Sequence, residues 1–133
     1  MSKKKHEGKT GNGFSMREEL IELIIERLER DLGPIRAEFT SERPVKTKYC
    51  AIDDLLPADI AQRISDAFPD SGQMRLLDSF REKKYTSKSL DQFDPLIADI
   101  TFAFQDKRVI DKVAALTGIK DAVGDPHLYA GGI

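Results

Sequence analysis

The sequence predicts an α+β fold in a single domain, with helices packed on a few short strands. A length of 133 residues is that of one domain, and a hydrophobic content of 40% is enough for a buried core. Apolar residues recur at helical spacing in four segments, whereas residues 49–52 form a short uninterrupted apolar run typical of a buried strand. Residues 1–13 are basic and nearly free of large apolar side chains, so we expect a disordered tail there and one domain over residues 14–133.

The first predicted helix covers residues 16–32. Ser15 stands three residues before Glu18, which is the spacing of a capping box at a helix start. The apolar residues of this segment make a wide stripe along one side of the helix. A stripe this wide needs a cover, which is either the core of the chain or a partner. We favour the core, formed with a helical pair at 94–117 or with the strand layer at 49–52.

The next part of the chain is read from its prolines. A Gly-Pro pair at 33–34 is a stop signal, so a polar linker is expected over residues 35–48. A strand at 49–52 follows it. Pro57 suits the first position of a second helix, and Pro69 ends that helix.

The second half of the chain holds two more predicted helices. Residues 74–85 mix apolar and charged side chains and are expected to be extended. Asp94 and Asp106 each have the position of an N-cap, and Gly118 is expected to close the second helix as a left-handed cap. A final strand is expected over residues 127–133.

Composition excludes several classes of protein. Lys and Arg number 21 against 23 Asp and Glu, so the net charge of -2 gives no electrostatic basis for a nucleic-acid partner. The single cysteine, Cys50, rules out an intramolecular disulfide and is expected to be an inert buried thiol. No apolar run approaches the ~18 residues of a membrane span, and no apolar signal core follows the basic start. We therefore predict a cytoplasmic protein without a membrane partner.

Residues that could carry chemistry are few. The two histidines are His6 in the basic tail and His127 near the other end. A mononuclear iron site of the facial-triad kind needs two imidazoles and a carboxylate around one ion. Asp53 and Asp54 lack the ligand spacing of a calcium loop and are read as turn residues. The residues themselves thus predict no catalytic group and no metal ligand.

Two stretches carry a resemblance to a known family. The first is Tyr-Cys-Ala-Ile-Asp-Asp-Leu-Leu-Pro at 49–57, followed by a helix that ends in Ala-Phe-Pro at 67–69. The second is Leu-Thr-Gly-Ile at 116–119, then Gly-Asp-Pro-His-Leu-Tyr-Ala-Gly-Gly-Ile at 124–133. Their order resembles the N-terminal half of bacterial 2-oxoglutarate/Fe(II)-dependent dioxygenases of the prolyl-4-hydroxylase-like class. The likeness covers about residues 46–133.

This resemblance implies the helical support and first strands of a double-stranded β-helix, or jelly roll, whose remainder is missing. Complete relatives use Fe(II) and 2-oxoglutarate, with ascorbate, to hydroxylate a prolyl, peptidyl or small-molecule substrate. Their iron ligands, a His-x-Asp pair and a distant His, lie beyond the Gly-Gly strand, and no His-x-Asp occurs in this sequence. The resemblance therefore implies a fragment that is inactive and binds no cofactor alone. It carries over one residue, Tyr129, on the strand that lines the co-substrate pocket.

A second interpretation is a non-catalytic helical protein-interaction module. In it, the helix at 16–32 and the pair at 94–117 present an apolar face to a partner. Self-association is expected through that first helix or through the edge of the strand at 127–133, which no Lys, Arg or Pro protects. The sequence identifies no substrate under either interpretation.

Overall fold

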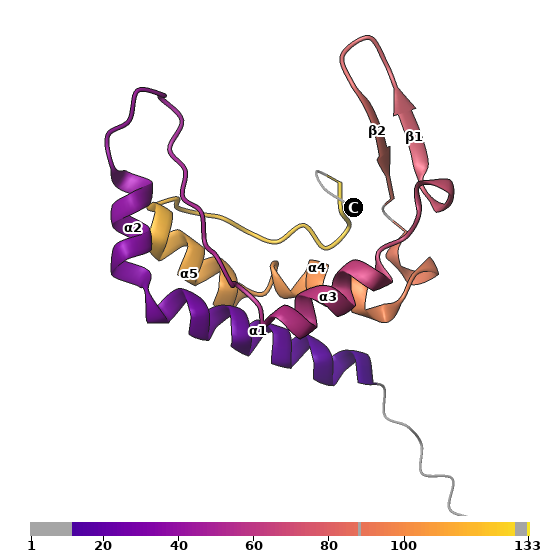
Figure 1. Cartoon of the computed structure of the whole chain (residues 1–133), viewed down its shortest axis with the longest axis horizontal. Coiled ribbons are helices and arrows are strands. Elements are labelled where there is room, and N and C mark those ends of the chain that lie inside the picture. Colours follow the sequence, from indigo (N-terminus) through magenta and orange to yellow (C-terminus); the bar gives the residue numbers. More distant parts are fainter. Residues whose placement is uncertain (1–11, 88, 130–132) are drawn as a thin grey trace, which may run out of the picture.

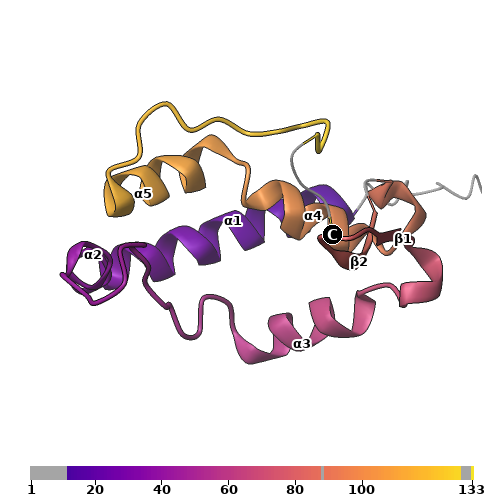
Figure 2. The same cartoon turned by 90° about the horizontal axis from the view of Figure 1, so that it is seen from above.

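The computed structural model describes residues 12–87, 89–129 and 133, and over these residues the fold is α+β, as predicted. The described part contains five α-helices and a two-stranded antiparallel sheet. The longest helix, α1, packs against α4 and α5, and α3 packs on α4; in Figure 2, α5 and α3 lie on opposite sides of α1. The sheet is a hairpin that projects from this helical body (Figure 1).

Helix α1 spans Asn12–Arg30 and begins earlier than the sequence analysis predicted. Ser15 lies inside the helix, so its predicted role as the N-cap is wrong. The described helix already includes residues 12–14 before Ser15. Of the predicted tail at 1–13, only Asn12 and Gly13 are among the described residues, and both belong to α1.

The predicted stop at 33–34 is also wrong, because a second helix, α2, spans Leu32–Thr40. Pro34 lies in the first turn of α2, where its nitrogen needs no intrahelical hydrogen bond. The break between the two helices falls at Asp31 instead, with φ of -126°. The irregular linker therefore begins at Ser41 rather than at residue 35.

The predicted strand at 49–52 is not a strand in the structure. These residues run as an irregular segment, and the side chains of Cys50 and Ile52 pack on the helical core. Arg27 Nε of α1 donates a hydrogen bond to the carbonyl of Asp53 at 3.1 Å, which fixes the segment on that helix. A short apolar run is buried equally well by helices or by a sheet, which is why its pattern did not separate the two.

The remaining helices begin and end near their predicted signals. Helix α3 spans Ala58–Ala67 directly after Pro57. Helix α4 spans Pro95–Ala103 and α5 spans Lys107–Thr117. The N-cap carboxylates of both accept a hydrogen bond from the backbone two residues on. Gly118 has φ of 76° and closes α5 as a left-handed cap, as predicted.

The extended segment predicted at 74–85 is confirmed as a hairpin. Strand β1 spans Arg75–Asp78 and β2 spans Lys83–Thr86, and they pair antiparallel with Leu76 opposite Tyr85. At the end of β2, Ser87 and Ile133 exchange two backbone hydrogen bonds of 2.8 and 3.0 Å.

The predicted final strand is wrong over residues 127–129, which are a turn and irregular backbone. Leu128 has φ of 53°, outside the extended region, and is buried against Leu90 and Ile97. Residues 130–132 of that predicted strand lie outside the described residues. Among the described residues of this segment, Ile133 has the backbone pairing that a strand would give, with Ser87.

The core confirms that α1 packs within the chain. Its apolar stripe contacts α4 and α5, and the four residues at its centre are at most 3% exposed: Leu20, Ile21, Ile24 and Leu28. Helix α2 packs on α5, and α3 packs on α4. Outside this core, the hairpin and the segment at 118–124 beside α5 are among the places where the described residues expose large apolar side chains.

Candidate functional site

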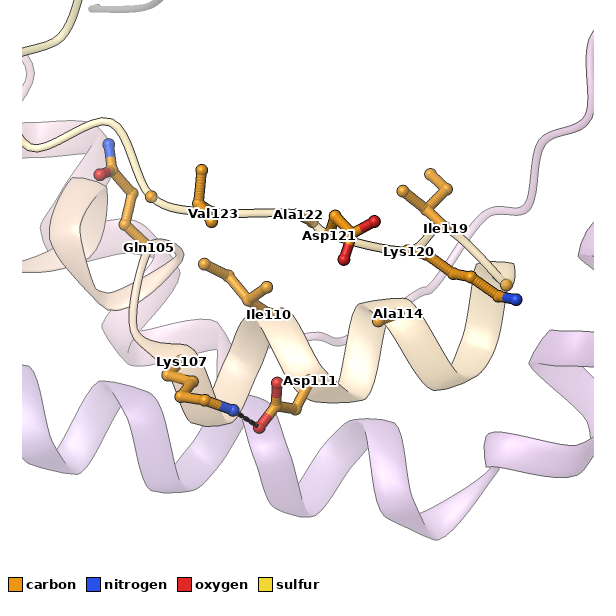
Figure 3. A pocket seen from close by; sticks show the side chains of 12 residues that line it. Gln105, Lys107, Ile110, Asp111, Ala114, Ile119, Lys120, Asp121, Ala122 and Val123 are labelled. Carbon is orange, nitrogen blue, oxygen red and sulfur yellow. Dashed lines mark hydrogen bonds and ion pairs between the residues drawn. The ribbon is translucent and has the colours of Figure 1, made fainter.

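A groove of about 860 Å³ runs between α5 and the segment at 118–124, which passes over the helix (Figure 3). Gly118 turns the chain at one end of this groove. At the other end, Gln105 Oε1 accepts a hydrogen bond from the Asp125 N–H at 2.7 Å. A Cβ on Gly124 would lie 3.2 Å from the carbonyl oxygen of Gln105, so a glycine permits this close approach.

The groove has an apolar floor and charged rims. Ile110 and Ala114 come from α5, while Ile119 and Val123 come from the overlying segment and are 56% and 85% exposed. Lys107 Nζ pairs with Asp111 at 2.7 Å on the rim. None of the lining residues is His, Cys or Ser. The groove can therefore bind an apolar group, and its only polar side chains are lysine, aspartate and glutamine.

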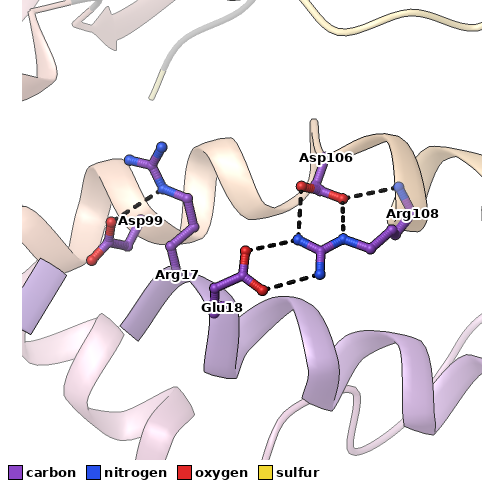
Figure 4. Close-up of polar contacts among 5 residues, drawn as sticks. All are labelled: Arg17, Glu18, Asp99, Asp106 and Arg108. Atoms are coloured by element: carbon purple, nitrogen blue, oxygen red, sulfur yellow. Dashed lines mark hydrogen bonds and ion pairs between the residues drawn. The ribbon is translucent and has the colours of Figure 1, made fainter. Parts of the chain in front are cut away.

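A cluster of charges joins α1 to the start of α5 (Figure 4). The guanidinium of Arg108 donates to both carboxylate oxygens of Glu18, at 3.0 and 2.8 Å, and its Nε donates to Asp106 at 2.8 Å. The hydrogen bonds from Arg108 lower the pKa of Glu18 and of Asp106, and they raise the pKa of Arg108 itself. All three groups stay ionised, so the cluster is an electrostatic clamp rather than a proton-transfer site.

Asp99 of α4 is the charged residue that the described fold buries, with 4% of its surface exposed. Its Oδ1 accepts a hydrogen bond from Arg17 Nε at 3.3 Å, and its Oδ2 has no partner among the described residues (Figure 4). Burial raises the pKa of Asp99 more than the positive charge of Arg17 lowers it. The guanidinium of Arg17 also lies over the ring of Phe102, 5.3 Å from its centroid.

A cavity of about 370 Å³ lies beside this ion pair and includes Leu90, Asp91 and Phe93 in its lining. The cavity pairs the buried carboxylate of Asp99 with the guanidinium of Arg17 and includes no His, Cys or Lys in its lining. Asp99 is not among the functional residues predicted from the sequence. A signal was present, since it is a lone carboxylate within the apolar run 96–104.

The residue carried over from the resemblance, Tyr129, lies on the surface with 80% exposure. Its ring is 5.7 Å from the ring of His127, and neither residue lines the α5 groove or the Asp99 cavity. Cys50 is half-buried. Within the ranges that the structure describes, no three His, Cys, Asp or Glu side chains are grouped as a metal site. The described residues therefore do not fit Fe(II).

Comparisons with known proteins leave the family open. No protein-family model matches the chain, and no curated protein or solved structure is significantly similar to it. Among the described helices, none has the length and apolar character required to cross a bilayer. The function of this chain is therefore inferred from its own geometry and from the resemblance in its sequence.

Proposed function

We propose that residues 46–133 form the N-terminal part of a 2-oxoglutarate/Fe(II)-dependent dioxygenase domain of the prolyl-4-hydroxylase-like class. The observation that carries this proposal is the reciprocal pair of backbone hydrogen bonds between Ser87 and Ile133. It brings the last residue of the Gly-Gly-Ile segment back to the hairpin, although the two residues are far apart in the sequence. Two residues that exchange both bonds form an antiparallel pair.

The position of Ser87 decides which edge of the sheet receives Ile133. The Ser79 N–H donates to the Glu82 carbonyl at 2.8 Å and closes the hairpin. Hydrogen-bonded pairs alternate along an antiparallel ladder, so Thr86 is directed toward β1 and Ser87 is directed away from it. Ile133 therefore lies at the outer edge of β2, where the proposed sheet would add a third strand.

The helices have a supporting role under this proposal. Helices α1, α4 and α5 contribute buried apolar residues to one core, and Leu128 of the segment at 118–129 packs with Leu90 and Ile97. The described residues supply no iron site, so no catalytic step is assigned to them. Their part in the domain is to position the first strands of its sheet.

The direct test is the gene downstream of codon 133. We expect a His-x-Asp within a few dozen codons, in frame or shifted. The extended chain should then convert 2-oxoglutarate to succinate in the presence of Fe(II), and replacing the histidine of that His-x-Asp with alanine should abolish the conversion. Downstream sequence without a His-x-Asp in any frame contradicts the proposal.

The α5 groove favours a second candidate, a non-catalytic helical protein-interaction module. Its apolar floor at Ile110 and Ala114 is half-buried and open to the groove, whereas the central stripe of α1 is fully buried. This changes the original form of the hypothesis, because α5 rather than α1 presents the free apolar face. A stop codon at position 134 with no His-x-Asp remnant beyond it favours this candidate over the dioxygenase.

A further inference from the structure

The hairpin exposes large apolar side chains that its two strands do not bury. Leu76 and Tyr85 lie directly opposite each other on one face and are 43% and 47% exposed. Phe80, in the turn between the strands, is 99% exposed. Figure 1 shows the hairpin pointing away from the helices, with β1 on its outer side. Two strands alone are only marginally stable in water, so this element is incomplete as a sheet.

The outer edge of β1 is free to accept another strand. Ile133 pairs at the outer edge of β2, so that edge is partly occupied. The alternation that directs Ser87 away from β1 also directs the backbone N–H and C=O groups of Leu76 and Asp78 away from β2. None of these four backbone groups has a hydrogen-bond partner within the described part of the chain. An edge of this kind is a template for pairing with another chain.

We propose that β1 pairs with β1 of a second copy of this chain, antiparallel around a two-fold axis at Leu76. A two-fold axis perpendicular to the sheet keeps corresponding faces of the two hairpins on the same side. Because side chains alternate along a strand, the residues that lie opposite each other must then both have even numbers or both have odd numbers. Leu76 then faces Leu76 of the second copy, and Arg75 faces Leu77. This register makes about four backbone hydrogen bonds, because the Met74 N–H already donates to Ser71.

The proposed dimer completes an apolar stripe across four strands. Its order is Tyr85, Leu76, then Leu76 and Tyr85 of the second copy, all on the same face. The pairs in this stripe are aromatic and aliphatic side chains directly opposite each other, which stabilise a sheet. The four-stranded sheet has the strand number at which a sheet becomes stable independently.

Charge favours a second copy over an unrelated strand. β1 carries Arg75 at one end and Asp78 at the other, so antiparallel pairing places the positive end of one strand beside the negative end of its mate. In the Leu76 register, Asp78 faces Met74 of the second copy, and no like charges are directly opposed. Arg75 and Asp78 project from opposite faces of the sheet, so the two strand ends attract each other without forming a direct ion pair.

Sedimentation of the full chain over a wide range of concentration tests the proposal. We expect a monomer–dimer equilibrium, and we expect the substitution Leu76→Pro to weaken dimerisation at least about tenfold. That proline removes the outward N–H and no hydrogen bond of the hairpin. Leu76→Val is the matched control, because it keeps the N–H and an apolar side chain, and it should dimerise like the parent. A monomer up to ~1 mM, or a Leu76→Pro variant that dimerises normally, overturns the proposal.

Two further measurements guard against a variant that simply loses its hairpin. In the unaltered chain, the amides of Leu76 and Asp78 should become protected from hydrogen exchange as concentration rises. In a Cys50→Ser background, Leu76→Cys should form an intermolecular disulfide under mild oxidation, since paired residues lie about 5.5 Å apart at Cα. Exchange at these amides that is independent of concentration, or preferential crosslinking through Leu77→Cys, contradicts the proposed register.

Discussion

The helical body and the hairpin solve the same problem of apolar burial to different extents. In α1, Leu20, Ile21 and Ile24 are at most 1% exposed because α4 and α5 cover them. In the hairpin, Leu76 and Tyr85 contact each other across the strands and still expose nearly half of their surface. The helices find their cover inside the chain, and the hairpin does not.

This difference follows from the geometry of the two kinds of element. A helix satisfies its own backbone and needs a partner for only one stripe of side chains. A strand needs partners along both edges as well as cover on its faces. The described chain supplies five helices that pack on one another but only a single residue, Ile133, for the outer edge of β2. Most of the stability should therefore lie in the helical body.

The largest expected effect is from Ile24→Ala in the helical body. Ile24 is 1% exposed, so its removal should cost about 2–5 kcal/mol of the free energy of unfolding. Ile119→Ala is the matched control because Ile119 is 56% exposed, and it should cost much less. Urea denaturation measures both, and an unchanged midpoint for Ile24→Ala would show that the stripe of α1 is not covered.

A smaller, pH-dependent effect is expected at Asp99. Its folded pKa is raised above the ordinary value of 3.8, so the folded state binds more protons than the unfolded state between the two values. Stability should therefore fall as pH rises through this window. Asp99→Asn removes that loss, so its stability relative to the parent should increase with pH.

Urea unfolding between about pH 4 and pH 7 measures this trend, with the exposed Asp91→Asn as a control from the same cavity. A relative stability of Asp99→Asn that does not change with pH would show that Asp99 is hydrated in the folded chain.

A still smaller effect is expected from Arg108→Ala, because its ion pairs are half-exposed. The lowered pKa of Glu18 and of Asp106 means that their contribution is present above the ordinary values of 4.5 and 3.8 and is lost as pH falls below them. The difference between variant and parent should thus shrink in acid and in high salt.

Thermal melts in low and high salt test this clamp. Lys107→Ala, which removes a pair within α5 alone, serves as the control. A destabilisation by Arg108→Ala that salt does not change would indicate lost packing rather than lost charge.

No measurable effect is expected from Fe(II) and 2-oxoglutarate on this chain. Neither the helical body nor the hairpin groups three metal-ligating side chains within the described residues, and His127 stands at the surface. Anaerobic calorimetry should show no saturable binding of Fe(II), or of Mn(II) as its substitute. One-to-one binding in the micromolar range would place an iron site in the chain and contradict this expectation.

The parts of the fold that local chemistry controls were predictable from the sequence. Asp94, Asp106 and Gly118 marked the ends of α4 and α5 because capping depends on a few neighbouring residues. The errors came where one signal has two solutions. Pro34 stops a helix or begins one, and the apolar run at 49–52 fits a strand or an irregular segment packed on helices.

The candidate sites were less predictable because they depend on tertiary contacts. The α5 groove exists because the segment at 118–124 passes over the helix, which its sequence does not reveal. The unpartnered Oδ2 of Asp99 depends on how α1 and α4 pack. The Ser87–Ile133 pair likewise joins residues that no local pattern connects.

Native-state hydrogen exchange of the full chain at micromolar concentration tests most directly whether the helical body carries the stability. At this dilution, interior amides of α1 and α4 should exchange with solvent only through global unfolding. The amides of the hairpin should exchange through local opening, whose free energy should be much smaller than that of global unfolding. Hairpin amides as strongly protected as those of α1 in the dilute monomer would contradict the distinction between the closed helical body and the open hairpin.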